Sequence, residues 1–126
     1  MSQPLSRPDV EPPTGPAPAD LETEDLVVGD GQEAKAGDLV SAHYVGVTHD
    51  GGEQFDASWD RGDPLEFRLG VGMVIQGWDE GIQGMRIGGR RRLTIPAHKA
   101  YGDRGAGGVI KPGATLVFVV DLVGIR

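Results

Sequence analysis

Short apolar runs separated by glycine-rich and aspartate-rich segments make up the chain from Leu26 onward. The clearest alternation lies in residues 115–123, where Leu116, Phe118, Val120 and Leu122 share one face of an expected strand. Strands are predicted over residues 27–28, 39–48, 53–56, 65–69, 85–95 and 115–123, with Gly88-Gly89 interrupting the fifth. The short segments between them favour mostly antiparallel pairing.

Only one stretch has helical periodicity. Apolar residues recur there three and four positions apart, at Val74, Ile75, Trp78, Ile82 and Met85. Gly81 and Gly84 limit its length, so such a helix requires packing against the sheet to persist. The predicted fold class is α+β, an antiparallel sheet of five to six strands wrapped around one short helix.

The first 22 residues differ in composition from the rest. Six of the nine prolines lie between Pro4 and Pro18, among small and acidic residues. Such a segment buries too little apolar surface to offset its ordering entropy, so residues 1–22 are predicted to be a disordered arm and residues 23–126 one folded domain. A solvated tail is the simplest interpretation. Two alternatives are that the arm binds a partner domain and that it binds in the protein's own cleft.

Charge and cysteine content exclude several functions. The net charge is −7, but six acidic residues and Arg7 place −5 of it in residues 1–25, leaving −2 for the domain. No basic face is expected, so nucleic acid is not a predicted partner. The absence of cysteine excludes disulfides and thiolate metal sites. No signal peptide or apolar span is evident, so we expect a cytoplasmic protein with no membrane partner.

The remaining polar motifs are weak. His43, His49 and His98 lack the spacing of metal ligands, and we predict no metal. Residues 102–108 fit neither common phosphate-loop pattern and are interpreted as a turning loop. The basic cluster of residues 90–92 is interpreted as a solvated strand edge. The informative side chains are then aromatic, and core packing is the better interpretation of any one taken singly.

An ordered series of motifs changes this interpretation. The segments are Ala42-His-Tyr-Val-Gly46, Gly52-Glu-Gln-Phe-Asp-Ala-Ser58, Val74-Ile-Gln-Gly-Trp-Asp-Glu-Gly81, Ala100-Tyr-Gly102 and Ile110-Lys-Pro-Gly-Ala-Thr-Leu-Val-Phe118. In this order and spacing, the chain from Leu26 to Ile125 resembles the FK506-binding (FKBP) peptidyl-prolyl cis/trans isomerases of small single-domain form. The resemblance has no long insertion between strands.

The resemblance implies an enzyme that accelerates rotation about X-Pro bonds by non-covalent binding of the twisted amide, and that assists protein folding. The catalytic residues it implies are Asp56, Tyr101, Ile75 and Trp78. The substrate-binding residues it implies are Tyr44, Phe55, Arg61, Leu65, Val74, Ile110 and Phe118. It implies no cofactor. The implied partners are proline-containing polypeptides and macrolide inhibitors such as tacrolimus and rapamycin, bound by a monomer.

Two positions depart from the family pattern. Leu65 stands where the best-known members have phenylalanine, and residues 104–108 form a loop of mostly small residues. Both changes make the rim of the cleft less aromatic and the loop above it more mobile. A binding module with weak catalysis is therefore a second hypothesis, and a β-rich adaptor whose aromatics only fill the core is a third.

Overall fold

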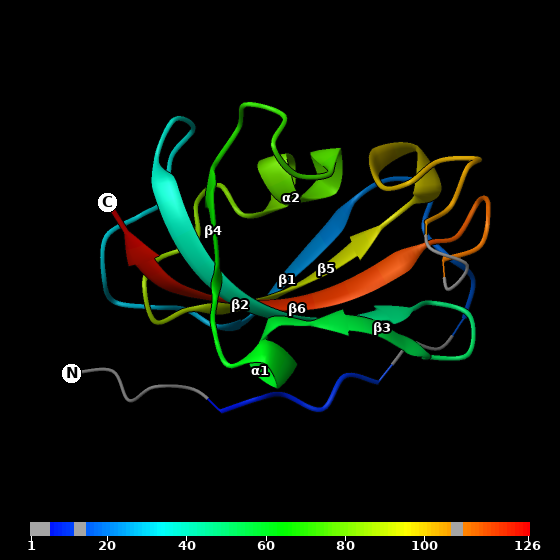
Figure 1. The fold of residues 1–126 in the computed structure, drawn as a ribbon, viewed down its shortest axis with the longest axis horizontal. Coiled ribbons are helices and arrows are strands. Elements are labelled where there is room, and N and C mark those ends of the chain that lie inside the picture. Colours follow the sequence, from blue (N-terminus) through cyan, green and yellow to red (C-terminus); the bar gives the residue numbers. More distant parts are fainter. Residues whose placement is uncertain (1–5, 12–14, 107–109) are drawn as a thin grey trace.

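The computed structural model describes residues 6–11, 15–106 and 110–126, which form one antiparallel sheet with short helices (Figure 1). Its strands are β1 (Glu22–Val27), β2 (Leu39–Thr48), β3 (Gln54–Ala57), β4 (Leu65–Arg68), β5 (Arg90–Ile95) and β6 (Leu116–Ile125). Its helices are α1 (Ser58–Arg61), α2 (Gln76–Gly81) and the 3-10 helix η1 (Ala97–Lys99). The predicted α+β fold class, a sheet wrapped around a short helix, is confirmed.

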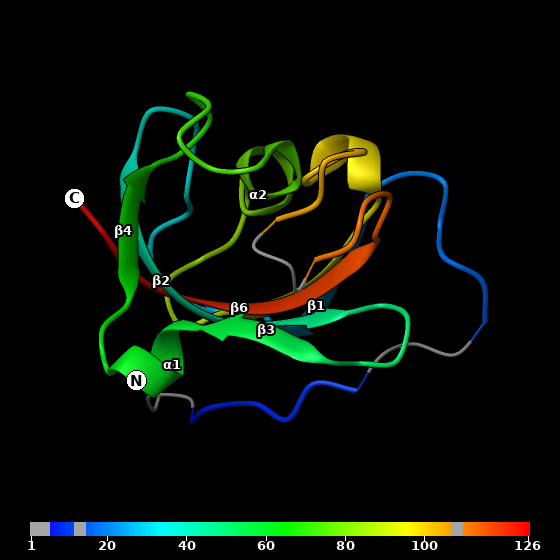
Figure 2. The ribbon, with the colours of Figure 1, turned by 45° about the vertical axis from the view of Figure 1, so that its right-hand side comes forward.

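Strands β2 and β6 form the centre of the sheet. The strand order is β1-β5-β6-β2-β3, and β4 pairs with the first part of β2. Tyr44 of β2 lies opposite Val120 of β6, and Gly46 lies opposite Phe118. The face that carries α2 is called the inner face here, and the opposite one the outer face (Figures 1 and 2). Both faces of β6 are buried from Leu116 to Leu122.

Helix α2 lies directly on strand β5 because its glycines permit a close approach. A Cβ atom on Gly77 would lie 2.5 Å from Cγ2 of Ile95, and one on Gly81 would lie 2.9 Å from Cδ2 of Leu93. Trp78, between these glycines, is buried in the main core. The glycines therefore set the distance between helix and sheet as well as the helix length.

The boundaries of several elements differ from the predicted ones. Strand β1 begins at Glu22, although only residues 27–28 were predicted as a strand. The earlier part was missed because all residues of β1 are exposed and show no alternation of apolar and polar positions. Strand β5 begins only at Arg90, after Gly88-Gly89, and α2 covers just the middle of the predicted helical stripe. Helices α1 and η1 were not predicted, since four and three residues are too few to show a periodicity.

The sequence suggested that the basic cluster of residues 90–92 is a solvated strand edge. This interpretation is wrong, because β5 is not an edge strand. Strand β1 pairs outside β5 and supplies two of the opposing charges, and β6 supplies the third. Arg90 pairs with Asp121, Arg91 with Asp25, and Arg92 with Glu24. The exposed fractions of the three arginine side chains are 16%, 14% and 31%, so none is fully solvated.

The described part of the N-terminal arm lies against the sheet. Residues 6–11 run along the outer face, and the chain then turns towards β1, which it enters at Glu22 (Figures 1 and 2). The predicted disorder of residues 1–22 stays a prediction, and residues 1–5 and 12–14 lie outside the described part. Within the described residues, no helix has the length and apolar character needed to cross a membrane.

Candidate active site

A cleft of about 600 Å³ opens on the inner face beside the N-terminal end of α2. Its size is within the range of small-molecule sites, and its lining is mostly apolar. The lining residues are Tyr44, Phe55, Asp56, Leu65, Met73, Val74, Ile75, Trp78, Tyr101, Ala106, Ile110 and Phe118. The sheet, α2 and the loops beside them thus bring together every predicted site residue except Arg61, which contacts the lining. The catalytic and binding roles of these residues stay predictions.

Trp78 forms the floor of the cleft. Only 3% of its surface is exposed, and its ring lies edge-on to Tyr44 and Phe118 at centroid distances of 4.9 and 5.3 Å. On its other side, the ring of Phe67 lies 5.6 Å away. Such edge-to-face contacts fix ring orientation and add to the energy of burial. The floor is therefore rigid before any ligand arrives.

Phe55 and Phe118 form one wall, and a glycine lies behind both of them. Their rings are edge-to-face at 5.4 Å. A Cβ atom on Gly46 would lie 2.6 Å from Cζ of Phe55 and 2.8 Å from Cε1 of Phe118. The absence of a side chain at Gly46 thus determines how far both rings recede. Sequence reasoning missed this role, although Gly46 closes the first family motif.

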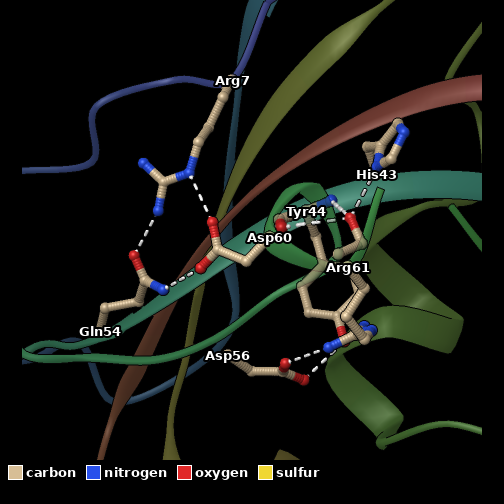
Figure 3. Close-up of polar contacts among 8 residues, drawn as sticks. Arg7, His43, Tyr44, Gln54, Asp56, Asp60 and Arg61 are labelled. Atoms are coloured by element: carbon tan, nitrogen blue, oxygen red, sulfur yellow. Dashed lines mark hydrogen bonds and ion pairs between the residues drawn. The ribbon is translucent and has the colours of Figure 1, made fainter. Parts of the chain in front are cut away.

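A polar triangle of Asp56, Arg61 and Tyr44 borders the cleft (Figure 3). The Tyr44 hydroxyl donates to Asp56 Oδ2 at 2.5 Å, while Arg61 donates to Asp56 Oδ1 at 2.6 Å and to the Tyr44 oxygen at 2.8 Å. Both carboxylate oxygens of Asp56 are therefore occupied. Arg61 lies outside the lining because its guanidinium serves this triangle.

The triangle fixes the protonation states of its members. Burial opposes ionisation of Asp56, but hydrogen bonds from Tyr44 and Arg61 outweigh it and hold the pKa of Asp56 below its ordinary value. Burial, followed by the bond to Asp56, raises the pKa of Tyr44. The hydrogen bonds to Tyr44 and Asp56 raise the pKa of Arg61. At neutral pH, Asp56 is thus an anchored anion, unsuited to accepting protons.

Two donors face the cleft with capacity to spare. The Tyr101 hydroxyl has no hydrogen-bond partner among the described residues, and the side chain is 39% exposed. Burial, and then the nearby charge of Asp56, raise the pKa of Tyr101, which keeps its proton available for donation. Ile75 immediately precedes α2. Its carbonyl accepts from Trp78 and Asp79, whereas its own N–H has no partner within the described chain.

Asp79 shapes the loop that leads into α2. Its carboxylate accepts the Gly70 N–H at 2.8 Å and the Gly72 N–H at 2.9 Å. Both glycines have left-handed backbones, with φ of 82° and 81°, which residues with a Cβ rarely adopt. Asp79 thereby positions the segment that carries Val74 and Ile75 into the cleft.

The two predicted departures from the family pattern both border the cleft, one in the loop above it and one in β4. Ile110 is 7% exposed and forms a two-way backbone bridge with Ala106, at 2.9 and 3.0 Å. Residues 107–109 lie outside the described residues, so the predicted small-residue loop is described only as far as Ala106. Leu65, at the start of β4, also lines the cleft and is 36% exposed. Met73 and Ala106 also line the cleft and were missed, since neither belongs to a quoted motif.

Comparisons with known proteins agree on one family. Residues 30–123 match the family model of the FKBP-type peptidyl-prolyl cis-trans isomerases. An FK506-binding protein of Streptomyces anulatus is 61% identical over 122 residues, which cover 96% of this chain and 98% of that protein. A probable FK506-binding protein of Corynebacterium glutamicum is 51% identical over 119 residues, or 94% and 98% of the two chains. The crystal structure of AtFKBP13 superposes with a TM-score of 0.79 at 46% identity, covering 87% of this chain and 96% of that one.

Proposed function

Because the chain belongs to the FKBP-type peptidyl-prolyl cis-trans isomerases, we propose that it catalyses X-Pro rotation without covalent chemistry, by binding the twisted amide in the cleft above Trp78. The observation that supports this most is the lining itself. It combines aromatic and aliphatic walls with a few hydrogen-bonding groups, and its one carboxylate is already occupied. Within the described residues, no group of three or more acidic or histidine side chains is arranged to hold a metal ion.

The reaction requires little from such a site. Rotation about a peptide bond has a barrier of about 18–20 kcal/mol because it breaks amide resonance. For X-Pro bonds the two isomers differ by only about 0.5–1 kcal/mol, so both are populated and only the barrier between them limits exchange. The enzyme has only to bind the twisted amide more tightly than either planar form.

The apolar walls favour the twisted amide over the planar one. A planar amide carries the larger charge separation, so removing water from its carbonyl destabilises it more than the deconjugated form. The proline ring would lie on Trp78, between the rings of Tyr44, Phe55 and Phe118. Phe118 and Trp78 are each 3% exposed, so they are already desolvated and reorganise little on binding.

The unpartnered donors would hold the client chain on both sides of the rotating bond. The Tyr101 hydroxyl and the Ile75 N–H would each donate to a peptide carbonyl, and would restrain the chain in a turn compatible with rotation. Asp56 would act as a fixed charge at the rim, since Arg61 and Tyr44 keep it ionised and occupied.

The same cleft supports proposals about ligands and role. A macrolide such as tacrolimus or rapamycin would occupy the floor and walls in place of proline. The names of the two relatives refer to binding of FK506, which is tacrolimus. We also propose that proline-containing polypeptides are the clients and that the protein assists their folding as a monomer. Leu65 and Met73, exposed at 36% and 63%, would then contact the residue before proline.

Replacing Tyr101 by phenylalanine is expected to lower kcat/KM about two- to tenfold, which corresponds to one neutral hydrogen bond of about 0.5–1.5 kcal/mol. Because the hydroxyl has no partner among the described residues, thermal stability should not change. A protease-coupled assay on a proline peptide measures the first effect and thermal unfolding the second. An unchanged kcat/KM would remove Tyr101 from the list of donors.

The folding role is tested by refolding a protein whose slow phase is limited by proline isomerisation. We expect the chain to accelerate this phase at substoichiometric concentration, and we expect tacrolimus to abolish the acceleration. Capture of the client without any gain in rate would instead favour the binding-module hypothesis. A rate gain insensitive to tacrolimus would place the client site outside the cleft.

A further inference from the structure

The outer face of the sheet is apolar at its centre, although the helix that lies beside it, α1, is only four residues long. Val45 and Val47 of β2, Ala57 of β3 and Val117 of β6 form a second cluster there, each at most 3% exposed. An antiparallel sheet with one solvated face normally carries polar residues on that face. The burial of these four side chains therefore requires a cover.

Residues 6–11 of the arm supply that cover. Pro8 is buried, and Val10 packs against the cluster together with Trp59. Trp59 in turn stacks on His43 with a centroid distance of 4.1 Å and an interplanar angle of 15°. Figures 1 and 2 both show this segment running along the side of the sheet opposite α2. The contacts thus belong to the outer face, away from the cleft.

Polar groups attach the same segment at its first two residues, Ser6 and Arg7. Arg7 donates to Asp60 at 3.2 Å and to Gln54 at 2.5 Å, and Gln54 donates to Asp60 at 2.9 Å, closing a ring of three side chains (Figure 3). At the adjacent residue, Arg90 donates to the Ser6 carbonyl while it also donates to the buried Asp121. Arg7 of the arm and Asp60 of α1 therefore carry complementary charges, in addition to the apolar contact of Val10 with the cluster.

The residue types suit this position. A proline has no backbone N–H, so Pro8 can lie on an apolar surface without leaving a donor unsatisfied. The neighbouring Asp9 is exposed and points its charge away from the contact. Composition alone predicts disorder for such a segment, because it does not include the surface on which the segment lies.

We propose that the outer face of the sheet is a docking surface for the chain's own residues 6–11, separate from the proline cleft. The docked arm covers the cluster of Val45, Val47, Ala57 and Val117 and shields it from solvent. Through Arg7, the arm also bonds to Gln54 and Asp60. In the sequence these two residues lie on either side of Phe55 and Asp56, the two cleft residues of β3. The folded unit then begins at Ser6 rather than at residue 23, and the arm's Pro8 is kept away from the cleft.

A spin label at Asp9 tests the docking directly in the full chain. The chain has no cysteine, so Asp9→Cys provides a unique attachment site on an exposed side chain. With the nitroxide, the NMR signals of the Trp59 indole and the Val45, Val47 and Val117 methyls should broaden far more than the Trp78 indole. A diamagnetic label of the same size is the reference. Broadening strongest at Trp78 would show arm occupancy of the cleft, and weak uniform broadening would show an undocked arm; either result would overturn the proposal.

A pair of single substitutions tests the polar attachment. Arg7→Ala should shift the Trp59 indole signal towards its position in a chain lacking residues 1–11, whereas Asp9→Ala should leave it unchanged. The two changes remove one charge each from neighbouring arm positions, so a general charge effect would shift both. The docking proposal fails if neither the deletion nor Arg7→Ala moves the signal. Neither readout depends on isomerase activity.

Discussion

Replacing Trp78 by alanine is expected to lower the free energy of unfolding by about 3–5 kcal/mol, the usual cost of removing a large aromatic side chain from a core. Trp78 is 3% exposed and contacts the rings of Tyr44, Phe67 and Phe118. The same change removes the floor of the cleft. Because about 1.5–3 kcal/mol of apolar contact is lost, kcat/KM should fall about tenfold to a hundredfold. Denaturant unfolding measures the first effect and a peptide assay the second.

The control separates the two losses. Leu69 is fully buried in the same core and does not line the cleft, so Leu69→Ala should cost about 2–5 kcal/mol of stability. Its kcat/KM, measured well below the unfolding transition, should stay near that of the unmodified chain. Equal losses of kcat/KM in both variants would mean that Trp78 acts through stability alone.

Replacing Gly77 by alanine is expected to destabilise the protein by about 1–3 kcal/mol, although the same change stabilises an isolated helix by about 1 kcal/mol. The added Cβ would lie 2.5 Å from Cγ2 of Ile95, a side chain with no exposed surface. Relief requires α2 to move off β5, and α2 carries the floor of the cleft. We therefore expect kcat/KM to fall together with the unfolding midpoint.

Two further variants test this explanation. Gln76→Ala introduces alanine at the neighbouring, exposed position of α2 without adding a Cβ, and should alter stability by no more than about 0.5 kcal/mol. Truncating the obstacle, in the double variant Gly77→Ala with Ile95→Ala, should cost less than the sum of the two single changes. Strict additivity would show that the close contact is not the cause.

The strands with alternating apolar residues could be predicted because alternation reports one buried face. Strand β2 was predicted with its observed bounds, Leu39–Thr48. Strand β1 could not be found in this way, because an exposed edge strand with ion pairs to Arg91 and Arg92 carries no such signal. The continuous apolar run Leu116–Val120 indicates a strand that is buried on both faces. It therefore predicts that other residues cover the outer face as well as the inner one.

The cleft residues came from family motifs, and spacing alone would have assigned them to the core. What the sequence cannot show is which separated residues approach each other closely. Gly46 and Gly77 matter because of Phe55, Phe118 and Ile95, which are distant along the chain. The attachment of Arg7 to Asp60 likewise joins residues 53 positions apart. Such contacts appear only when the sheet is assembled.

The pH dependence of kcat/KM follows from the protonation states at the cleft. The folded pKa of Asp56 is lowered, so its ionised state and the stability it contributes are present above about pH 4 and are lost only as the pH falls through the folded pKa. The pKa values of Tyr44 and Tyr101 are raised, so both hydroxyls stay protonated, and the associated stability persists, up to about pH 10. No group in the described lining therefore changes charge at intermediate pH.

The most direct test of catalysis without proton transfer is the pH profile of kcat/KM, measured on a proline peptide with no ionisable side chains. A site that only binds and restrains the twisted amide should give a flat profile between about pH 5 and 9. A bell-shaped profile with an apparent pKa inside this range would contradict the account, because it would require a titrating acid or base in the rate-determining step.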